Sequence, residues 1–428
     1  MTTPSGSVLF NSSTGSDTDS SGLGPATAIT GYGAELDGTS TVDVSMDGID
    51  FTTMSVGDLL FCTTSSGRQF SIIASIDDIN ETITTDDAWP YESGVQWAVG
   101  GKRASLDGSQ DMWIKTDGVT GLTYELETDQ TMSSYVTSYS DITGTLKSSV
   151  AGTQRVVDLG SSYFTVGGIW NFHDIHFKSS ANLYLGRADT SSQTATWYLY
   201  DCTVGDATDT FASMGTSSSR TFTVYALRTV FKDFTGVVFS SINANLDYCI
   251  VKDCDSGVFY QHSTASASHF ARHTVFTNCA YFSYQRRSQS TNIQQCVIHG
   301  MTNTSDIMYY ADYAPGHIID NIWMDNAGDI ETYTSTRFFG NAYYNNTVNY
   351  PPSMESDAIT LTADPFTDAA SGDFSLNDDT GGGTVLRAVS KTFGSTSGYP
   401  FLWLTDGSGG GGGSTYHPLA LPNHPLAQ

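Results

Sequence analysis

A short segment recurs eight times between residues 170 and 350 of this chain, and its spacing limits the folds that the chain can adopt. Successive copies lie 20 to 27 residues apart, and none shows a useful length of helical periodicity. A period in this range with strand-like units indicates a solenoid of β-strands, in which every repeat extends one continuous core. One column of the aligned copies, which we call the anchor column, contains Ile175, Cys202, Thr229, Cys249, Thr274, Cys296, Asn321 and Asn341.

The residues after each anchor follow the pattern of a strand and then a corner. The residue two positions after the anchor is aliphatic or aromatic in all eight copies. Residues i and i+2 share one face of a strand, so both columns are predicted to point into one core. The residue four positions after the anchor is mostly Asp, Asn or Gly, which tolerate a sharp turn. The predicted core stack is Phe231, Val251, Phe276, Ile298 and Trp323.

The stacked anchors and their apolar neighbours resemble the right-handed parallel β-helix family, which includes pectate-lyase-like enzymes and many phage tailspikes. Motifs near both ends are similar to that family: the strand Val8–Phe10 with residues 15–17 (GSD) and 22–27 (GLGPAT), and Asp364–Phe366 with Gly372–Leu376. The resemblance implies an all-β fold, a right-handed parallel β-helix solenoid with a small antiparallel β insertion near the N-terminus. It says little about function, because one fold carries unrelated activities.

The pattern changes along the chain and divides it into four expected parts. Residues 1–49 are expected to form an opening strand and cap. Residues 50–100 contain short alternating segments joined by turns, which predict a small antiparallel β subdomain. Residues 101–390 are assigned to the parallel β-helix. Residues 391–428 contain five consecutive glycines and then a Pro-rich peptide, which predict a flexible linker and a docking peptide.

The charge and hydropathy of the chain argue against several classes of function. The chain has 45 acidic and 18 basic residues, and its formal charge is −27. Such a chain repels phosphate backbones, so we expect no nucleic-acid partner. No stretch approaches the ~18–20 apolar residues of a membrane-spanning helix, so we expect no membrane insertion. The first 22 residues lack the basic and apolar regions of a Sec signal peptide, which favours release by lysis or by a dedicated machine.

The column directly after the anchor is expected to face away from the core, yet its central members are large aliphatic residues. We call this column the outer strip. An apolar strip several strands long is expected to be covered, either by a loop of the same chain or by the same strip of neighbouring subunits. Phage β-helices commonly trimerise along their length, so the resemblance implies a homotrimer. The candidate subunit contacts in the outer strip are Val230, Ile250, Val275, Val297 and Ile322.

The C-terminal peptide offers a second set of candidate subunit contacts. Its apolar side chains stand on a Pro-stiffened backbone, which loses less entropy when it docks. We therefore expect residues 415–428 to contact a symmetry-related copy or a different virion protein. The candidate contacts in this peptide are Tyr416, Pro418, Leu419 and Leu421.

Asp174 and Asp201 are the one carboxylate pair that the sequence offers for catalysis. They precede successive anchors, so they are expected to lie one strand apart, at about 4.7–4.9 Å. This separation suits a retaining glycosidase or a calcium site, whereas the alternative is that both are solvated surface residues. No GxSxG motif, P-loop or dinucleotide-binding motif is present, and no catalytic, cofactor-binding or metal-ligating residues are assigned. The calcium-site interpretation makes Ca²⁺ the one candidate cofactor.

The six cysteines form no CxxC pair and no zinc-binding pattern. We predict reduced, buried thiols without metal, because free cysteine is among the most buried residue types. The cysteines are Cys62, Cys202, Cys249, Cys254, Cys279 and Cys296.

These features favour a phage virion structural protein, a homotrimeric β-helical spike or fibre on the capsid or tail. Its expected partners are itself, other virion proteins and a host glycan, and its expected location is the virion. One alternative is a polysaccharide lyase or glycoside hydrolase on the same scaffold, which would release sugar products. Another is a cell-surface adhesin or filament subunit, which would need a secretion signal.

Overall fold

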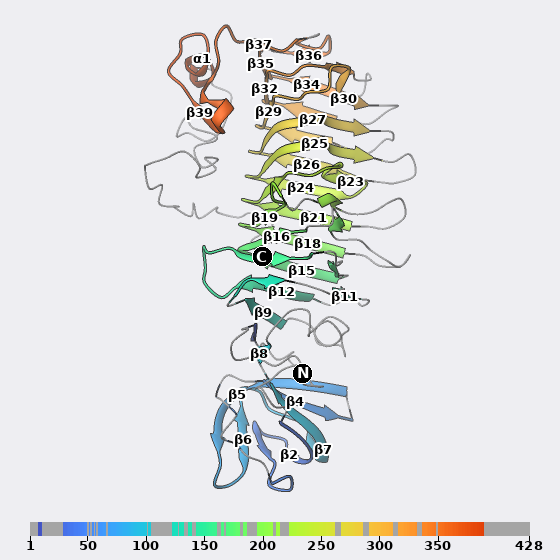
Figure 1. Ribbon diagram of the computed structural model, residues 1–428, viewed down its shortest axis with the longest axis vertical. Coiled ribbons are helices and arrows are strands. Elements are labelled where there is room, and N and C mark those ends of the chain that lie inside the picture. Colours follow the sequence, from blue (N-terminus) through green and yellow to red (C-terminus); the bar gives the residue numbers. More distant parts are fainter. Residues whose placement is uncertain are drawn as a thin grey trace.

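The computed structural model shows an elongated protein built almost entirely of β-strands (Figure 1). Two long sheets of parallel strands form the body, and a small antiparallel barrel lies at one end of it. The expected all-β class is confirmed. Among the residues that the structure describes, no helix is long and apolar enough to cross a membrane. The structure describes residues 7–10, 29–48, 51, 54, 56, 59–65, 67–100, 102–103, 122–126, 128–131, 136–138, 143–160, 164–166, 168–179, 183–185, 195–208, 211–214, 222–261, 267–285, 291–310, 316–331, 336–347 and 350–388.

Among the described residues, six antiparallel strands form the closed barrel. They are β2 (Ile29–Asp37), β3 (Thr41–Asp43), β4 (Leu59–Thr64), β5 (Gly67–Asp77), β6 (Thr82–Thr85) and β7 (Tyr91–Gly100). The barrel core includes Val42, Leu60, Ile83 and Trp97. The antiparallel subdomain was predicted at residues 50–100, but the barrel starts earlier and includes β2 and β3. Both strands are needed because the pairs β2–β7 and β3–β6 close the ring.

The first long sheet, which we call sheet 1, has thirteen strands joined in parallel pairs within the described parts of the chain. They are β1 (Ser7–Phe10), β8 (Lys102–Arg103), β9 (Leu122–Leu126), β12 (Thr143–Ser148), β15 (Gly168–His173), β18 (Ala195–Tyr200), β21 (Phe222–Leu227), β24 (Asn243–Asp247), β26 (His269–Arg272), β28 (Thr291–Gln294), β31 (Gly316–Ile319), β34 (Thr336–Phe339) and β36 (Glu355–Ser356). From β9 onward each strand pairs with the sheet 1 strand that follows it in the chain. The opening strand β1 pairs with β8 and β9.

The second long sheet, sheet 2, is also parallel, and the chain alternates between the two sheets. For example, β15 leads to the sheet 2 strand that begins at Ile175, and β18 to the one that begins at Thr203. The main path of sheet 2 consists of β10 (Gln130–Thr131), β13 (Arg155–Asp158), β16 (Ile175–Lys178), β19 (Thr203–Val204), β22 (Val230–Lys232), β25 (Ile250–Gln261), β27 (Val275–Gln285), β29 (Val297–His299), β32 (Ile322–Met324), β35 (Ala342–Tyr344) and β37 (Ile359–Thr360).

Shorter strands extend sheet 2 or form pairs of their own. Those that extend sheet 2 are β17 (Leu183–Leu185), β20 (Phe211–Met214), β23 (Phe239–Ser240), β30 (Asp306–Tyr310) and β33 (Asp329–Glu331). Two further strand pairs and two short helices complete the described structure: β11 (Val136–Ser138) with β14 (Phe164–Val166), β38 (Phe366–Asp368) with β39 (Asp373–Leu376), the 3-10 helix η2 (Ala369–Ser371) and α1 (Gly383–Ala388).

The anchor column and the apolar column beside it are buried, as predicted. The anchors from Cys202 to Asn341 have no exposed surface. Their side chains bond to carbonyl groups of the preceding repeats: the Cys202 thiol donates to Phe172 O at 3.4 Å, and the Thr229 hydroxyl donates to Leu199 O at 3.3 Å. The core stack is also confirmed, because its members are paired in register on adjacent strands and fully buried: Phe231, Val251, Phe276, Ile298 and Trp323.

The sharp turn predicted four residues after the anchor is confirmed in six of the repeats. The residues there adopt the left-handed conformation, with φ between 48° and 62°. Asp and Asn enter this region more readily than other non-glycine residues, so the sequence pattern and the backbone agree. In the repeat of Cys202 the turn falls one position earlier, at Gly205 with φ 97°. The six turn residues are Asp233, Asp253, Asn278, Gly300, Asp325 and Asn345.

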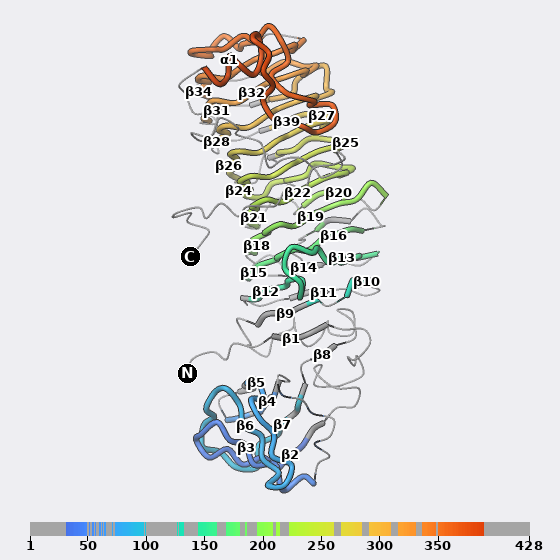
Figure 2. Tube along the Cα trace, turned by 90° about the vertical axis from the view of Figure 1, so that its left-hand side faces the viewer, coloured from blue at the N-terminus to red at the C-terminus, as the bar shows by residue number. Residues whose placement is uncertain are grey.

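The outer strip is covered by the C-terminal part of the same chain, which corrects its assignment as a subunit contact. Val275, Val297 and Ile322 have no exposed surface, Ile250 is buried, and Val230 is partly buried against them. In Figures 1 and 2, β39 and α1 lie against the side of the body that carries these strands. Because this segment already removes the strip from water, the strip has little surface left for another subunit. The covering residues are Leu361, Phe366, Ala369, Phe374, Leu376 and Leu386.

Candidate functional site

A row of corner residues directly before the anchors turns the chain from sheet 1 into sheet 2. Every member has positive φ, between 48° and 68°. Left-handed backbone costs most non-glycine residues about 1–2 kcal/mol, and Asn, Asp and His are the side chains most often found there. Arg228, Tyr248 and Gln295 are therefore unusual at these corners. We call this set the corner row: Asp174, Asp201, Arg228, Tyr248, His273, Gln295, Asp320 and Gly340.

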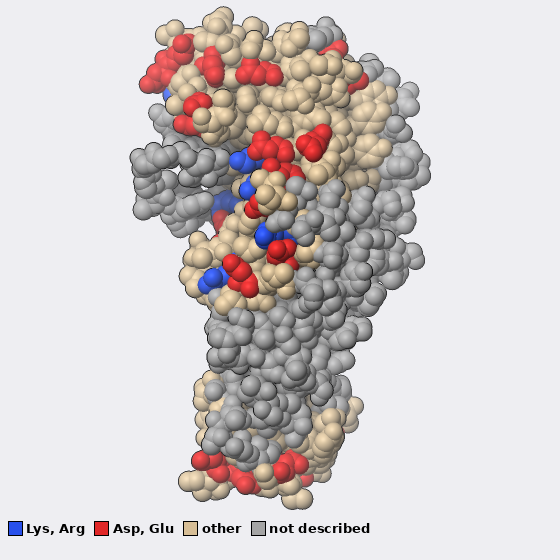
Figure 3. All heavy atoms as spheres, in the orientation of Figure 1, with Lys and Arg blue, Asp and Glu red and all other residues tan. Residues whose placement is uncertain are grey.

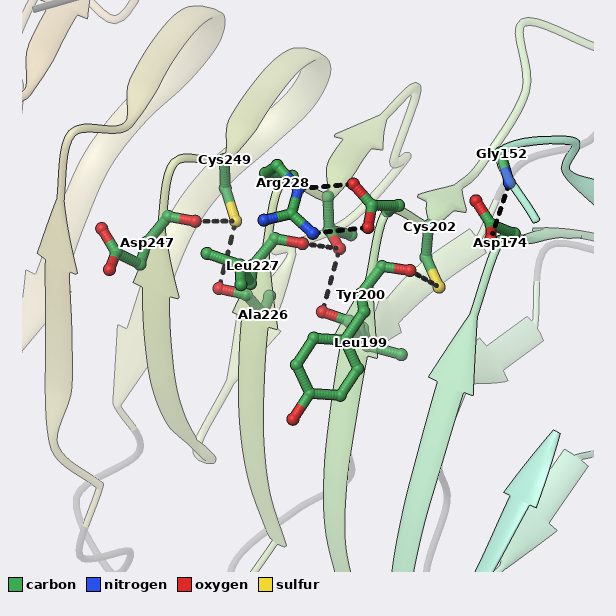
Figure 4. A network of polar contacts seen from close by, with 12 residues as sticks. Gly152, Asp174, Leu199, Tyr200, Cys202, Ala226, Leu227, Arg228, Asp247 and Cys249 are labelled. Atoms are coloured by element: carbon green, nitrogen blue, oxygen red, sulfur yellow. Dashed lines mark hydrogen bonds and ion pairs between the residues drawn. The ribbon is translucent and has the colours of Figure 1, made fainter. Parts of the chain in front are cut away.

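Asp174 and Asp201 follow paired strands of sheet 1, as the sequence analysis expected, but they do not form a free carboxylate pair (Figure 4). The Asp201 carboxylate accepts hydrogen bonds from Nε and Nη2 of Arg228, each at 2.6 Å. Asp174 accepts the backbone N–H of Gly152 at 3.1 Å. A retaining glycosidase needs one carboxylate as a nucleophile and the other as an acid. Arg228 engages both oxygens of Asp201, so this arrangement does not provide that nucleophile.

The following repeats bring together Asp247, Arg272 and His273. Asp247 Oδ2 accepts two N–H groups of Arg272, at 2.9 and 2.7 Å, and Oδ1 lies 3.1 Å from His273 Nδ1. Burial alone would raise the pKa of Asp247, but the hydrogen bonds from His273 and Arg272 hold that pKa below its usual range. The His273 ring stacks on Tyr248, with 4.5 Å between the ring centroids. A buried carboxylate and an aromatic ring thus hold this imidazole in one orientation.

The outward face of sheet 1 carries stacked aromatic rings beside the corner row. Along β18, Trp197 points inward and is fully buried, whereas Tyr198 and Tyr200 point outward and are partly exposed. Tyr198 stacks on Tyr225 of the next strand, with a centroid distance of 4.9 Å and an interplanar angle of 11°. Tyr200 stacks on His173 of the preceding strand at 4.5 Å and 13°. Partial burial raises the pKa of both β18 tyrosines, so they are uncharged at neutral pH.

Most of this surface was not predicted from the sequence. The alternation of residues 195–200 (ATWYLY) was a usable signal, because every second residue of a strand shares a face. It would have placed Tyr198 and Tyr200 outside. The contact between Asp247 and Arg272 had no local signal, because these residues are 25 positions apart and meet only through the register of β24 and β26.

The thiols lie in the interior, and their predicted burial is confirmed. All six are free and buried in the structure. Burial raises the pKa of Cys202 and Cys249 to about 12. A thiol with such a pKa is almost entirely protonated at neutral pH, which makes it a poor nucleophile.

The calcium and docking-peptide predictions gain no support here. Within the described parts of the chain, no group of three or more His, Cys, Asp or Glu side chains is placed to hold a metal ion. The C-terminal candidates Tyr416, Pro418, Leu419 and Leu421 lie outside the described residues. Their docking role therefore stays a prediction.

Comparisons of this chain with protein-family models, with curated proteins and with solved structures find no match. The class of protein must therefore be argued from the molecule. It is an all-β protein with two long parallel sheets, a closed barrel at one end, and a face of sheet 1 that combines stacked aromatic rings with charged and polar groups.

Proposed function

We propose that this chain is a right-handed parallel β-helix and a structural spike or fibre protein of a phage particle. Three features support the proposal: the alternation of strands between two parallel sheets, the buried anchor column, and the terminal motifs that resemble this family. In a solenoid each repeat packs on its neighbours, so the length of the shaft follows from the number of repeats. Such a shaft is suited to holding a recognition surface away from a particle.

The stacked aromatic rings on the outward face of sheet 1 support the proposal that the shaft faces a host glycan. The rings of Tyr198 and Tyr225 are parallel and partly exposed, and they offer flat apolar surface with polar hydroxyl groups. Sugar rings have apolar faces that pack on such side chains, and the corner row supplies hydrogen-bond donors and acceptors for hydroxyl groups. The formal charge of −27 opposes a polyanionic ligand, so the glycan is neutral.

Binding of the full-length protein to purified neutral surface polysaccharides of candidate hosts tests this proposal. We expect the double variant Tyr198→Ala/Tyr225→Ala to weaken binding at least tenfold. The matched control is Tyr260→Ala/Tyr284→Ala, which removes a second stacked pair with an interplanar angle of 11° from sheet 2. Equal binding by both double variants and the wild type would contradict the assigned face. No binding by the wild type to any such polysaccharide would contradict the glycan-facing role.

The homotrimer stays part of this proposal, but its contacts are assigned away from the outer strip. The strip is covered within one chain, so trimerisation is attributed to residues 391–428 and to surfaces outside the strip. Sedimentation equilibrium of the full chain is expected to give three times the monomer mass of 46.0 kDa. A monomeric mass at micromolar concentration would contradict this part of the proposal.

A second candidate function, glycan cleavage, is favoured by one observation, the orientation of His273 by the buried Asp247. A histidine held through Nδ1 by a carboxylate is suited to act as a general base through its other ring nitrogen. Under this alternative, incubation with a bound polysaccharide would release new reducing ends, and His273→Gln would abolish that release. Binding without release would favour the structural role.

A further inference from the structure

The barrel differs from the body in its charge. Residues 29–100 contain twelve acidic side chains and a single basic one, Arg68, so this segment contributes −11 to the total of −27. Figure 3 shows acidic atoms and no basic atoms on the described surface at the lower end of the barrel. The body, in contrast, has ion pairs such as Arg228 with Asp201 and Arg272 with Asp247. The field of the barrel is therefore strongly negative.

The barrel also presents the most exposed large apolar side chains among the described residues. Single exposed apolar residues are common on protein surfaces, but the most exposed of the described ones all belong to the barrel. The five on the barrel are 66% to 88% exposed, whereas Val150, Ile169 and Phe339 on the body are 40% to 49% exposed. The five barrel residues are Tyr32, Met46, Val56, Ile79 and Tyr91.

Three of these side chains stand on segments that are connected by backbone contacts. The N–H groups of Tyr32 and Gly33 donate to the Asp47 carboxylate at 3.3 and 3.1 Å, which joins the start of β2 to the loop that carries Met46. The Val44 N–H donates to Glu81 O at 3.0 Å, which joins the same loop to the turn that carries Ile79. We call Tyr32, Met46 and Ile79 the apolar rim.

The apolar rim is held rigidly by its buried attachments. Trp97 Nε1 donates to Asp47 Oδ2 at 2.7 Å, and Trp97 is almost fully buried. A Cβ on Gly31 would lie 2.2 Å from both the Asp47 carboxylate and the Trp97 ring, so only glycine allows this close approach. Tyr32 on β2 and Met46 on the loop after β3 are therefore exposed on segments that are fixed to the barrel core. A preorganised surface of this kind loses little entropy when it binds.

We propose that the apolar rim of the barrel docks on a protein partner whose contact surface is basic and contains apolar recesses. This inference rests on the proposed function and identifies the partner as a protein of the particle that anchors the spike. Charge complementarity indicates which kind of partner binds the apolar rim. A second barrel carries the same charge of −11 and is repelled, as are nucleic acids and anionic membranes. A basic protein surface is attracted by the negative field of the barrel, and its binding buries the exposed apolar side chains of the rim.

The test offers purified full-length chain to phage particles that lack this protein, and measures the number of copies bound. We expect Tyr32→Ser/Met46→Ser/Ile79→Ser to reduce occupancy at least tenfold. The matched control Val150→Ser/Ile169→Ser/Phe339→Ser removes the three exposed apolar side chains of the body and is expected to bind as the wild type does. All six positions are exposed, so the folded state is retained, and this is checked by the thermal midpoint of each variant.

A charge variant gives a second readout. Asp78→Asn/Asp86→Asn neutralises two exposed acidic residues of the barrel. We expect the rate of binding to fall severalfold, and its dependence on salt concentration to become weaker. An unchanged rate and an unchanged salt dependence would overturn the assignment of a basic partner.

The outcomes separate this inference from the proposed function. If the wild type binds the particles and the rim variant binds equally well, the rim is not the docking surface, although the chain is still a particle protein. A variant that lacks residues 408–428 is tested in the same binding assay. If only this variant loses binding, the C-terminal peptide is the attachment site and the inference is overturned. If the wild type does not bind at all, the proposed function itself fails.

Discussion

Asn321 occupies the middle of a buried ladder of side-chain hydrogen bonds, and its replacement by alanine measures how strongly this ladder stabilises the body. Its Oδ1 accepts the Cys296 N–H at 2.9 Å, and its Nδ2 donates to Ile293 O and to Asn341 Oδ1, both at 3.0 Å. The ladder ends at Glu355, whose carboxylate accepts the N–H and the side-chain amide of Asn341. Asn321 has no exposed surface, so water cannot replace these bonds.

The expected loss of stability depends on the buried polar groups that lose a hydrogen bond in Asn321→Ala. The Cys296 N–H and the Ile293 carbonyl lose the Asn321 side chain as a partner. Asn341 Oδ1 loses one donor but keeps the backbone N–H of Asn321 at 2.9 Å. A buried polar group left without its partner costs about 1–3 kcal/mol. The Cys296 N–H is such a group, whereas Ile293 also lies in the paired strand β28, so we predict a decrease of about 1–3 kcal/mol in the free energy of unfolding.

Urea unfolding followed by tryptophan fluorescence is a suitable assay, because Trp170, Trp197 and Trp323 lie in the same core as the ladder. The control is Asn292→Ala on the partly exposed face of sheet 1, which is expected to change stability by less than about 0.5 kcal/mol. If the unfolding midpoint of Asn321→Ala coincides with that of Asn292→Ala, the ladder does not stabilise the body.

Three further predictions concern the core, the covered strip and the thiols. Phe276→Ala should lower the free energy of unfolding by about 3–5 kcal/mol, the usual loss for a buried aromatic residue; a loss below 1 kcal/mol in urea titration would contradict its place in the stack. Phe374→Ser should loosen the C-terminal cover and increase the fluorescence of a hydrophobic dye bound at the outer strip, and unchanged dye binding would count against the cover. At pH 8 the thiols should react with a thiol reagent only after unfolding, because burial raises the pKa of Cys202 and Cys249 to about 12; fast labelling of the folded chain would disprove their burial.

Part of the candidate site was predictable and part was not. The sequence placed Asp174 and Asp201 on adjacent repeats, because both precede an anchor, and the structure agrees. It did not predict that Arg228 would engage both oxygens of Asp201, since an exposed arginine in the same column has many alternative partners. The chemistry of a carboxylate depends on such neighbours, so its position alone did not define its role.

The outer strip was also predictable only in part from the sequence. The sequence correctly indicated that Val275, Val297 and Ile322 would need a cover, because they are large and apolar on the outward side of a strand. The choice between a neighbouring subunit and the same chain could not be made from these residues. Phe366 and Phe374 of the C-terminal segment provide the cover, and they lie more than 40 positions after Ile322 in the chain.

The repeat, the inward columns and the corners of this protein could be predicted from the amino-acid sequence alone. These depend on local rules: alternate residues of a strand share a face, and Asp, Asn and Gly enter left-handed turns at low cost. Three other features became visible only in the three-dimensional fold: the closure of the barrel by β2 and β3, the contact between Asp247 and His273, and the cover of the outer strip by the C-terminal segment. Each of these contacts joins segments far apart in the chain. Their partners are selected by packing and register across the whole fold, and no local pattern of residues specifies that choice.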